Sequence, residues 1–167
     1  MEKIIFIPSQ FRIEPFYDNS LEIRELNEKS KLTIPFYNEI NIVNQICNKE
    51  ELIQNAESLI IDMIDYWKEI KPSISEMFRM RKKEQAKDLM ISCVANMISI
   101  LSWMNQVVIL DLRNLQVEIN KLPIKPLNFQ ERLSFLLNQP NHYHSLIQLT
   151  GLYEEIEKQY YKQKIKR

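Results

Sequence analysis

A single glycine, Gly151, occurs in this chain of 167 residues. Loops that cradle phosphate groups need several glycines, because their backbone must approach oxygen atoms closely and adopt φ values that other residues resist. The sequence accordingly contains no Walker A loop, no dinucleotide-binding G-x-G-x-x-G, no glycine-rich kinase loop and no G-x-S-x-G nucleophile elbow. Tight two-residue hairpins also favour glycine, so its scarcity argues against an all-β fold.

The length and composition predict one globular domain over residues 1–167. Hydrophobic residues make up 45% of the chain and charged residues 26%, a balance typical of folded rather than disordered proteins. The 22 basic and 22 acidic residues give a formal net charge of zero, so no overall field draws the protein towards nucleic acid or membranes. Any such partner must be bound by a local patch.

The cysteines and the first residues predict a cytoplasmic protein. Cys47 and Cys93 are the only cysteines and do not form a C-x-x-C pair, whereas secreted proteins that depend on disulfides carry more cysteines at framework spacings. The apolar run before Pro8 has only four residues, which is too short for a signal peptide.

Residues 89–110 carry no charge and are long enough to span a bilayer as a helix. Polar side chains nevertheless recur along this segment at helical spacing, opposite an apolar stripe. The polar positions are Ser92, Asn96, Ser99, Ser102 and Gln106. This pattern indicates a helix buried inside a bundle, so we expect no membrane-spanning segment and no membrane partner.

Prolines interrupt residues 1–47, so we expect these residues to form an N-terminal arm. The triplet Pro-Phe-Tyr occurs at 15–17 and again at 35–37. Each proline biases the preceding residue towards extended geometry, and the Phe-Tyr pair can then dock on a helical surface. We expect an irregular arm strapped over a bundle; the alternative is that the two pairs are anchors for a partner.

The remainder of the chain, residues 48–167, shows helical periodicity. Asn48 and Glu51 form a capping box at the start of a first helix, which Pro72 is expected to end. Similar boxes at 73–76 and 128–131 predict two further starts. The expected helices cover 48–71, 73–106 with a break near residue 84, 128–137 and 140–160, with an ambiguous connector at 107–127. The predicted fold class is therefore all-α: a bundle of four to five helices with an irregular N-terminal arm that contains aromatic residues and prolines.

A cluster of basic residues interrupts the apolar stripe after residue 78. Residues 79–88 contain five basic and two acidic residues; either the helix leaves the core at this point, or the basic groups face phosphates. The residues predicted to contact nucleic acid or phosphate are Arg79, Arg81, Lys82, Lys83 and Lys87. The basic tail at 158–167 would strengthen such binding if it lay near this cluster.

His142 and His144, the only histidines, flank Tyr143. On a strand, residues two apart share a face and can chelate a metal, but on a helix they point about 200° apart. Pro140 favours a helix that begins here. We therefore expect a helix start, with a recognition role for these three residues and with no bound metal or other cofactor.

Asp62, Asp65 and Glu69 share one helix face, as do the carboxylates that hold Mg²⁺ in all-α pyrophosphatases and prenyl synthases. Such sites need a second acidic helix opposite, and the sequence offers only Glu84 and Asp88, among lysines. A solvated face is the expected role of the three carboxylates.

Four segments of the chain resemble the YpoC-like proteins of Bacillus and relatives. They are YWKEIKP at 66–72, FRMRKK at 78–83, PLNFQERLSF at 126–135 and PNHYHSLIQL at 140–149. The genes of that family tend to lie near genes for replication initiation and base-excision repair, so the resemblance implies a cytosolic accessory of DNA metabolism. The family supplies no catalytic residue to carry over.

The leading hypothesis is a non-catalytic, cytosolic helical accessory protein that binds a protein partner and is linked to DNA replication or repair. The first alternative is direct binding of nucleic acid by the basic cluster at 79–87. The second is a metal-dependent hydrolase that uses His142, His144 and a helix carboxylate. We do not expect the protein to be an enzyme, and the sequence leaves its oligomeric state open.

Overall fold

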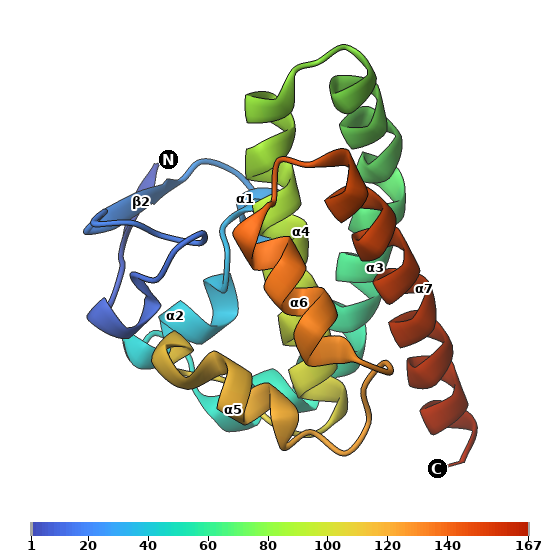
Figure 1. Cartoon of the computed structure of the whole chain (residues 1–167). Coiled ribbons are helices and arrows are strands. Elements are labelled where there is room, and N and C mark those ends of the chain that lie inside the picture. Colours follow the sequence, from blue (N-terminus) through green and yellow to red (C-terminus); the bar gives the residue numbers. More distant parts are fainter. Residues whose placement is uncertain (1, 167) are drawn as a thin grey trace.

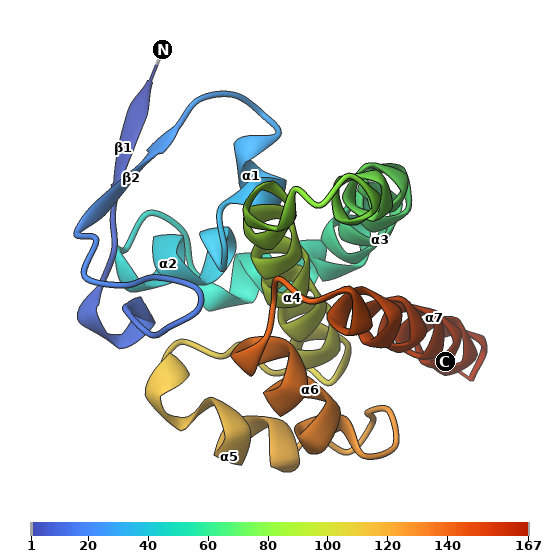
Figure 2. The ribbon, with the colours of Figure 1, turned by 45° about the horizontal axis from the view of Figure 1, so that its top comes forward.

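The computed structural model describes residues 2–166 and is mainly helical. Beyond the arm, the chain forms α3 (Lys49–Arg79), α4 (Lys83–Met104), α5 (Leu115–Asn120), α6 (Phe129–Asn138) and α7 (Tyr143–Ile165). Helix α4 lies at the centre, with α3 and α7 on one side of it and the arm on the other (Figures 1 and 2). The prediction of an all-α bundle of four to five helices is confirmed for this part of the chain.

The N-terminal arm is more ordered than predicted. It contains strands β1 (Lys3–Phe6) and β2 (Glu22–Glu25), which pair antiparallel, and a 3-10 turn, η1 (Ser9–Phe11). Two short helices follow, α1 (Ser30–Thr33) and α2 (Tyr37–Val43). The apolar run at 4–7 concealed the first strand, because its sequence does not alternate between apolar and polar residues.

The two Pro-Phe-Tyr triplets pack against each other, although Pro15 and Tyr37 are only half-buried. The rings of Phe16 and Phe36 meet edge to face, with centroids 4.8 Å apart. The Tyr17 hydroxyl donates a hydrogen bond to the Pro35 carbonyl oxygen at 2.8 Å. Phe16, Tyr17 and Phe36 are buried, so the strapped-arm interpretation is correct. The alternative, in which both pairs wait for a partner, is wrong because these rings already contact each other.

Helix α4 is the buried helix that the sequence predicted, since every residue from 90 to 104 is buried. None of the helices formed by residues 2–166 has the length and apolar character needed to cross a membrane. The polar stripe of α4 faces the arm. Ser92 Oγ donates to the Thr33 carbonyl at 2.6 Å, and Asn96 Nδ2 donates to the Leu32 carbonyl at 2.9 Å.

The predicted end of the first helix at Pro72 is wrong. Helix α3 continues through Pro72 to Arg79. Pro72 is exposed, but Ile74, two residues later, is fully buried. Packing of the residues after Pro72 therefore compensates for the backbone hydrogen bond that proline cannot make. The predicted break near residue 84 is present at residues 80–82, between α3 and α4.

Replacing this internal proline is expected to stabilise the protein. In a helix interior, proline is about 3 kcal/mol less favourable than alanine, and the greater freedom of the unfolded Pro72→Ala chain offsets up to about 1 kcal/mol. The free energy of unfolding, measured by urea denaturation, should therefore rise by about 2 kcal/mol. Ser73→Ala, at the neighbouring exposed position, is the control and should change it by less than about 0.7 kcal/mol. A loss of stability in Pro72→Ala would contradict this account.

The starts of α3 and α6 agree with the prediction to within one residue, whereas the start predicted at Ser73 is wrong. At the start of α3, Asn48 Oδ1 accepts from the Glu51 backbone N–H at 2.8 Å, as predicted. No helix begins at Ser73, and Asn128 precedes α6 with a positive φ of 57° and no side-chain cap. The connector at 107–127 contains a 3-10 turn, η2 (Leu112–Asn114), and the short α5.

The chain makes its sharp corners without glycine. Gly151 lies inside α7 with ordinary helical geometry, and a Cβ added there would meet Arg132 Nη2 at 3.5 Å, an ordinary contact. Non-glycine residues take the left-handed conformation instead. They are Phe36, Gln45, Arg81, Gln106 and Asn128.

Candidate interaction surface

Helices α3 and α4 form an antiparallel hairpin whose turn projects beyond the rest of the molecule (Figure 1). The turn consists of residues 80–82, with Arg81 in the left-handed conformation at a φ of 59°. Met80, Arg81, Lys82 and Lys83 are all exposed. The basic cluster therefore interrupts the apolar stripe because the two helices leave the core here.

The positive charges of the turn are only partly compensated. Arg79 Nε donates to Glu76 Oε2 at 2.9 Å, and this guanidinium lowers the pKa of the Glu76 carboxyl. Arg81, Lys82 and Lys83 form no ion pair with any side chain of residues 2–166. Three consecutive cations thus face solvent.

Lys87, the fifth predicted contact, lies on α4 rather than in the turn. It is half-buried and lines a cleft of about 870 Å³ between the start of α4, the arm and the end of α6. The carboxylates of Glu14, Asp18 and Asp88 line the same cleft. Arg79, Arg81, Lys82 and Lys83 thus gather at the turn, and Lys87, one helical turn after Lys83 on α4, lies at the edge of the cleft.

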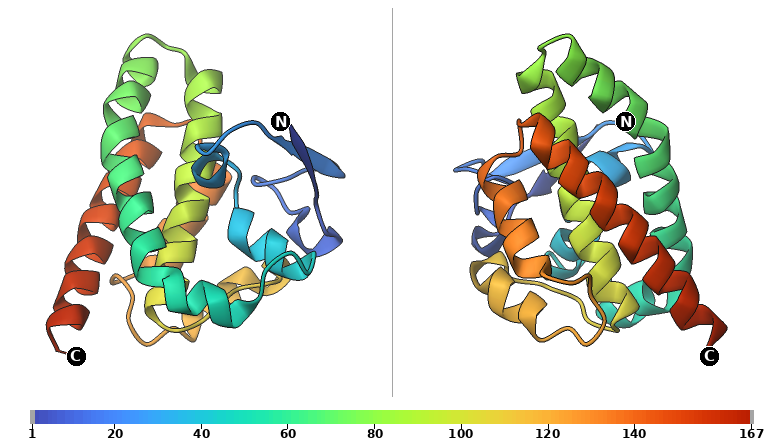
Figure 3. Two further views of the ribbon diagram at one scale, coloured as in Figure 1. Left: turned by 180° about the vertical axis from the view of Figure 1, so that it is seen from behind. Right: turned by 45° about the vertical axis from the view of Figure 1, so that its right-hand side comes forward.

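The basic C-terminal tail does not extend this surface. The C-terminus and the α3–α4 turn lie at opposite ends of the molecule (Figures 1 and 3). The ammonium of Lys164 pairs with Glu57 and lies over the ring of Tyr160. The tail therefore serves local packing at the end of α7, and the condition for joint binding with the basic cluster is not met.

The segment His142-Tyr143-His144 is a helix start, as predicted. His142 has extended backbone angles and precedes α7, of which Tyr143 is the first residue. All three side chains are exposed. No group of three or more His, Cys, Asp or Glu side chains that could hold a metal ion occurs in the described part of the chain.

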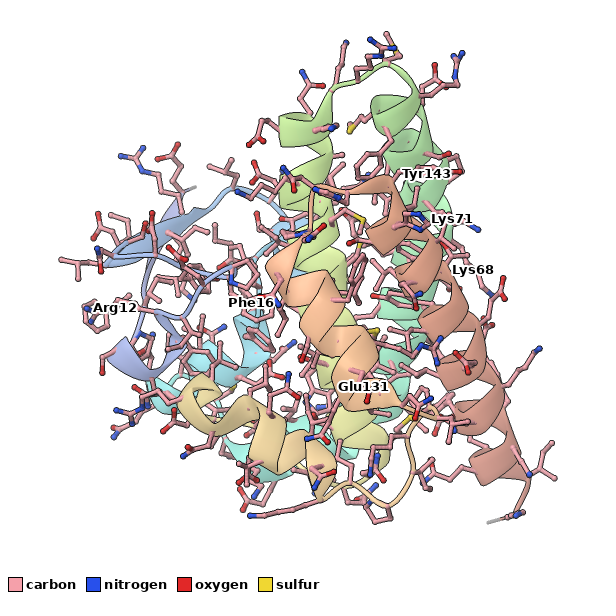
Figure 4. All side chains as sticks on the ribbon, in the orientation of Figure 1. Arg12, Phe16, Lys68, Lys71, Glu131 and Tyr143 are labelled. Carbon is pink, nitrogen blue, oxygen red and sulfur yellow. The ribbon has the colours of Figure 1, made fainter. Side chains whose placement is uncertain are left out.

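Two contacts place the start of α7 beside the α3–α4 hairpin. The ring of Tyr143 meets the ring of Phe78 edge to face, with centroids 6.1 Å apart. Asn141 Nδ2 donates to Glu84 Oε1 at 3.4 Å. Figure 4 shows Tyr143 near the upper end of α7, next to α3. The basic cluster and the histidine segment thus lie on the same side of the molecule, with the α3–α4 turn projecting beyond the start of α7 (Figure 1).

Exposed apolar side chains complete this side. Met80 is 52% exposed, Tyr143 56% and Ile147 50%. Ile147 follows Tyr143 by one helical turn, on the same side of α7. Helical spacing alone does not separate Ile147 from the buried Leu146 and Leu149, so the sequence did not identify it as a surface residue. We call this region the tip surface, formed by Met80, Arg81, Lys82, Lys83, His142, Tyr143, His144 and Ile147.

A second hollow separates α3 from α7 below the tip surface. Its floor contains Trp67 and Tyr153, whose rings stack with centroids 4.5 Å apart and planes 9° apart. Lys68 on α3 pairs with Glu157 on α7 at 2.6 Å across this hollow of about 440 Å³. Because the two rings are buried and the Lys68–Glu157 ion pair joins the helices across the hollow, we interpret the hollow as part of the packing contact between α3 and α7.

The acidic face of α3 is solvated, as predicted. Asp62, Asp65 and Glu69 are exposed. Glu69 lies 3.7 Å from the ammonium of Lys29, and no second acidic helix faces the three carboxylates within residues 2–166.

A buried carboxylate joins the arm to α4, and sequence analysis missed it. Glu39 on α2 is 2% exposed, and its Oε2 accepts from Ser99 Oγ at 2.6 Å. Desolvation raises the pKa of Glu39 to about 7, although the Ser99 hydrogen bond acts in the opposite direction. Glu39 Oε1 and Trp103 Nε1 are buried without a hydrogen-bond partner. No sequence signal marks Glu39, because α2 is too short to show a periodic pattern.

The part of the chain that resembles known proteins is the helical bundle. The profile of a family described as "YpoC-like protein" matches residues 57–167. A Bacillus subtilis (strain 168) protein named "Uncharacterized protein YpoC" is 30% identical over 100 residues, which is 60% of this chain and 61% of that protein. The chain thus covers less than two thirds of this relative's length. No solved structure matches the chain.

Proposed function

Because the chain belongs to the YpoC-like family, and the matched region includes the whole tip surface, we propose that this surface binds a partner and that the protein is a non-catalytic interaction protein. One observation carries the proposal. The Phe78–Tyr143 contact assembles unpaired cations and exposed apolar side chains from two distant segments into one projecting surface. Tyrosine, methionine and arginine side chains such as Tyr143, Met80 and Arg81 are enriched at protein-binding surfaces.

The nucleophiles of the chain support a non-catalytic role. Burial raises the pKa of the Cys93 thiol to about 12, so this cysteine is not a reactive thiolate. The Cys47 thiol also has a raised pKa, chiefly because of burial. His142 and His144 are exposed at the start of α7, and within residues 2–166 neither imidazole has a hydrogen bond to a serine or cysteine side chain; the Ser145 hydroxyl donates to the Gln139 carbonyl instead. The histidines are therefore better suited to contact a partner than to activate a nucleophile.

The proposed setting is the cytoplasm, as an accessory in DNA replication or repair. The resemblance of residues 66–72, 78–83, 126–135 and 140–149 to the YpoC-like family supports this setting, through the gene neighbourhood of that family. The tip surface supplies a place where a protein of that machinery would bind.

Site-specific photocrosslinking tests the proposal directly. A photoreactive phenylalanine analogue at Tyr143, in cells of the host organism, is expected to capture one defined protein. The control is the same analogue at Tyr161, which is 43% exposed near the other end of α7 and should not capture that protein. The purified pair should then bind, and Arg81→Ala/Lys82→Ala should weaken the affinity about tenfold or more. Equal capture from both positions would contradict a role for the tip surface.

Direct binding of nucleic acid is the second candidate, because Arg81, Lys82 and Lys83 are exposed and unpaired. Binding to phosphates releases counterions, so its affinity falls with salt with a logarithmic slope of about 0.9 per phosphate neutralised. Lys87 contributes little to such binding, since it lines a cleft together with three carboxylates.

A further inference from the structure

Two apolar side chains of the tip surface, Tyr143 and Ile147, are held in place before any partner arrives. The Phe78 ring packs against Tyr143 at 76°, and Tyr143 and Ile147 both belong to the long helix α7. Side chains held on rigid elements lose little conformational entropy on binding. Tyr143 and Ile147, each about half exposed and one helical turn apart on α7, form an apolar strip that is costly to leave in water and favourable to cover.

The charge around this strip is positive but small. Residues 76–84 contain four cations and two anions, which gives a local charge of +2. Arg79 is already paired with Glu76. The N-terminus of α7, which has no side-chain cap, adds the positive end of a helix dipole beside His142. A partner with a few negative charges is complementary to such a surface.

The size of this charge favours carboxylates of a peptide over a nucleic-acid backbone. Three unpaired cations neutralise at most three phosphates, whereas nucleic-acid-binding proteins commonly make about 6–10 phosphate contacts. The basic tail lies at the other end of the molecule and adds none. A phosphate backbone would also leave Tyr143 and Ile147 uncovered, while the apolar side chains of a peptide would bury them.

We infer that the tip surface binds an acidic peptide segment of a partner protein, with carboxylates against Arg81, Lys82 and Lys83 and apolar side chains against Tyr143 and Ile147. The inference rests on the proposed function and names the class of partner. Charge determines the approach and register of the segment, and the apolar contacts supply most of the affinity.

Fluorescence anisotropy with the full chain tests this inference. The probes are labelled peptides in which Asp and Glu alternate with Leu and Phe at several spacings. Two comparison sets replace either the acids by Asn and Gln or the apolar residues by Ser. Single- and double-stranded DNA are titrated beside them, at about 50 and 200 mM salt. The acidic–apolar peptides are expected to bind, and either replacement should weaken binding about tenfold or more.

Matched variants separate the two kinds of contact. Arg81→Ala/Lys82→Ala and Ile147→Ser are each expected to weaken peptide binding about tenfold. The controls are Lys158→Ala/Lys162→Ala, two exposed cations elsewhere on α7, and Leu127→Ser, an apolar residue that is 79% exposed. Both controls should bind as the native protein does.

The outcomes distinguish the inference from the proposed function. Failure of every acidic–apolar peptide to bind would overturn the inference. If DNA bound instead, with a loss in Arg81→Ala/Lys82→Ala but not in Ile147→Ser, the tip surface would remain the binding site and its partner would be nucleic acid. Peptide binding that no tip variant changed would overturn the inference and, together with equal photocrosslinking from positions 143 and 161, the proposed function.

Discussion

Glu39→Gln is expected to raise the free energy of unfolding by about 3 kcal/mol at a pH of about 8 and to change it little at a pH of about 4. Burial raises the pKa of Glu39 from its ordinary value of 4.5 to about 7. Each pKa unit corresponds to about 1.4 kcal/mol, so this difference amounts to roughly 3 kcal/mol at most.

The direction of the change in stability depends on whether the folded or the unfolded chain retains the Glu39 proton as the pH rises. Below a pH of about 4.5 Glu39 is protonated in both the folded and the unfolded chain, so its titration does not reduce the free energy of unfolding. As the pH rises to about 7, the unfolded chain releases the proton while the folded chain retains it, so stability falls. The neighbouring Tyr17 and Cys47 have raised pKa values and stay neutral over this range. Glutamine keeps an acceptor for Ser99 and removes the titration.

Urea denaturation of both proteins between a pH of about 4.5 and about 8 measures this effect. The difference in unfolding free energy between Glu39→Gln and the native protein should grow with pH and level off above about 7. Glu154→Gln, at an exposed position on α7, removes one carboxylate without a burial effect and serves as the control. A difference that did not depend on pH would contradict the buried titration of Glu39.

Trp67→Ala is expected to lower the free energy of unfolding by about 4 kcal/mol. Trp67 is 4% exposed and stacks on Tyr153, and truncation of a buried tryptophan to alanine costs about 3–5 kcal/mol. The Tyr153 hydroxyl donates to the Cys93 carbonyl at 2.5 Å. The stack therefore joins α3 and α7 to the central helix α4, and its removal weakens the contacts among all three helices.

Circular dichroism during urea denaturation is the suitable measurement, because the variant lacks one of the two tryptophans. Tyr153→Phe retains the ring and loses only the hydrogen bond to Cys93, so it should cost about 1–3 kcal/mol. Tyr161→Ala removes an exposed ring from the same helix and should cost less than about 1 kcal/mol. A loss below about 1 kcal/mol in Trp67→Ala would show that the ring stack contributes little to helix packing.

The bundle was predictable where the local pattern agrees with the final packing. Residues 89–110 alternate polar and apolar positions at helical spacing, and α4 buries both stripes. The helix end predicted at Pro72 was wrong, because the local rule that proline ends a helix competes with tertiary packing. The apolar residues after it face the core when the helix continues, and that burial outweighs one missing backbone hydrogen bond.

The tip surface was only half predictable. Its basic residues and the histidine segment each stand out in the sequence, but their proximity depends on the Phe78–Tyr143 contact between residues far apart in the chain. Ile147 was hidden among apolar neighbours of the same helix. The same limitation concealed Glu39, whose partner Ser99 belongs to a different element.

The arm and the central helix depend on each other, although the family match begins at residue 57 and omits the arm. Ser92 and Asn96 donate to carbonyl groups of the arm, and Ser99 donates to Glu39. Without the arm, these donors would lose its acceptors and bond to water, and the apolar surface of α4 that α1 and α2 cover would be exposed. The arm is therefore part of the folded domain.

The corners built without glycine affect the unfolded chain as well as the folded one. Glycine gives an unfolded chain more conformations than any other residue, so a chain with one glycine has less backbone entropy to lose when it folds. Against this gain stands strain of about 1 kcal/mol at each of the five left-handed residues. Local opening relieves that strain most easily where few buried apolar side chains hold the corner. Phe36 is 2% exposed and packed, whereas Arg81 lies in a turn whose residues are all exposed, so the α3–α4 turn that carries the basic side chains is the corner from which opening costs least.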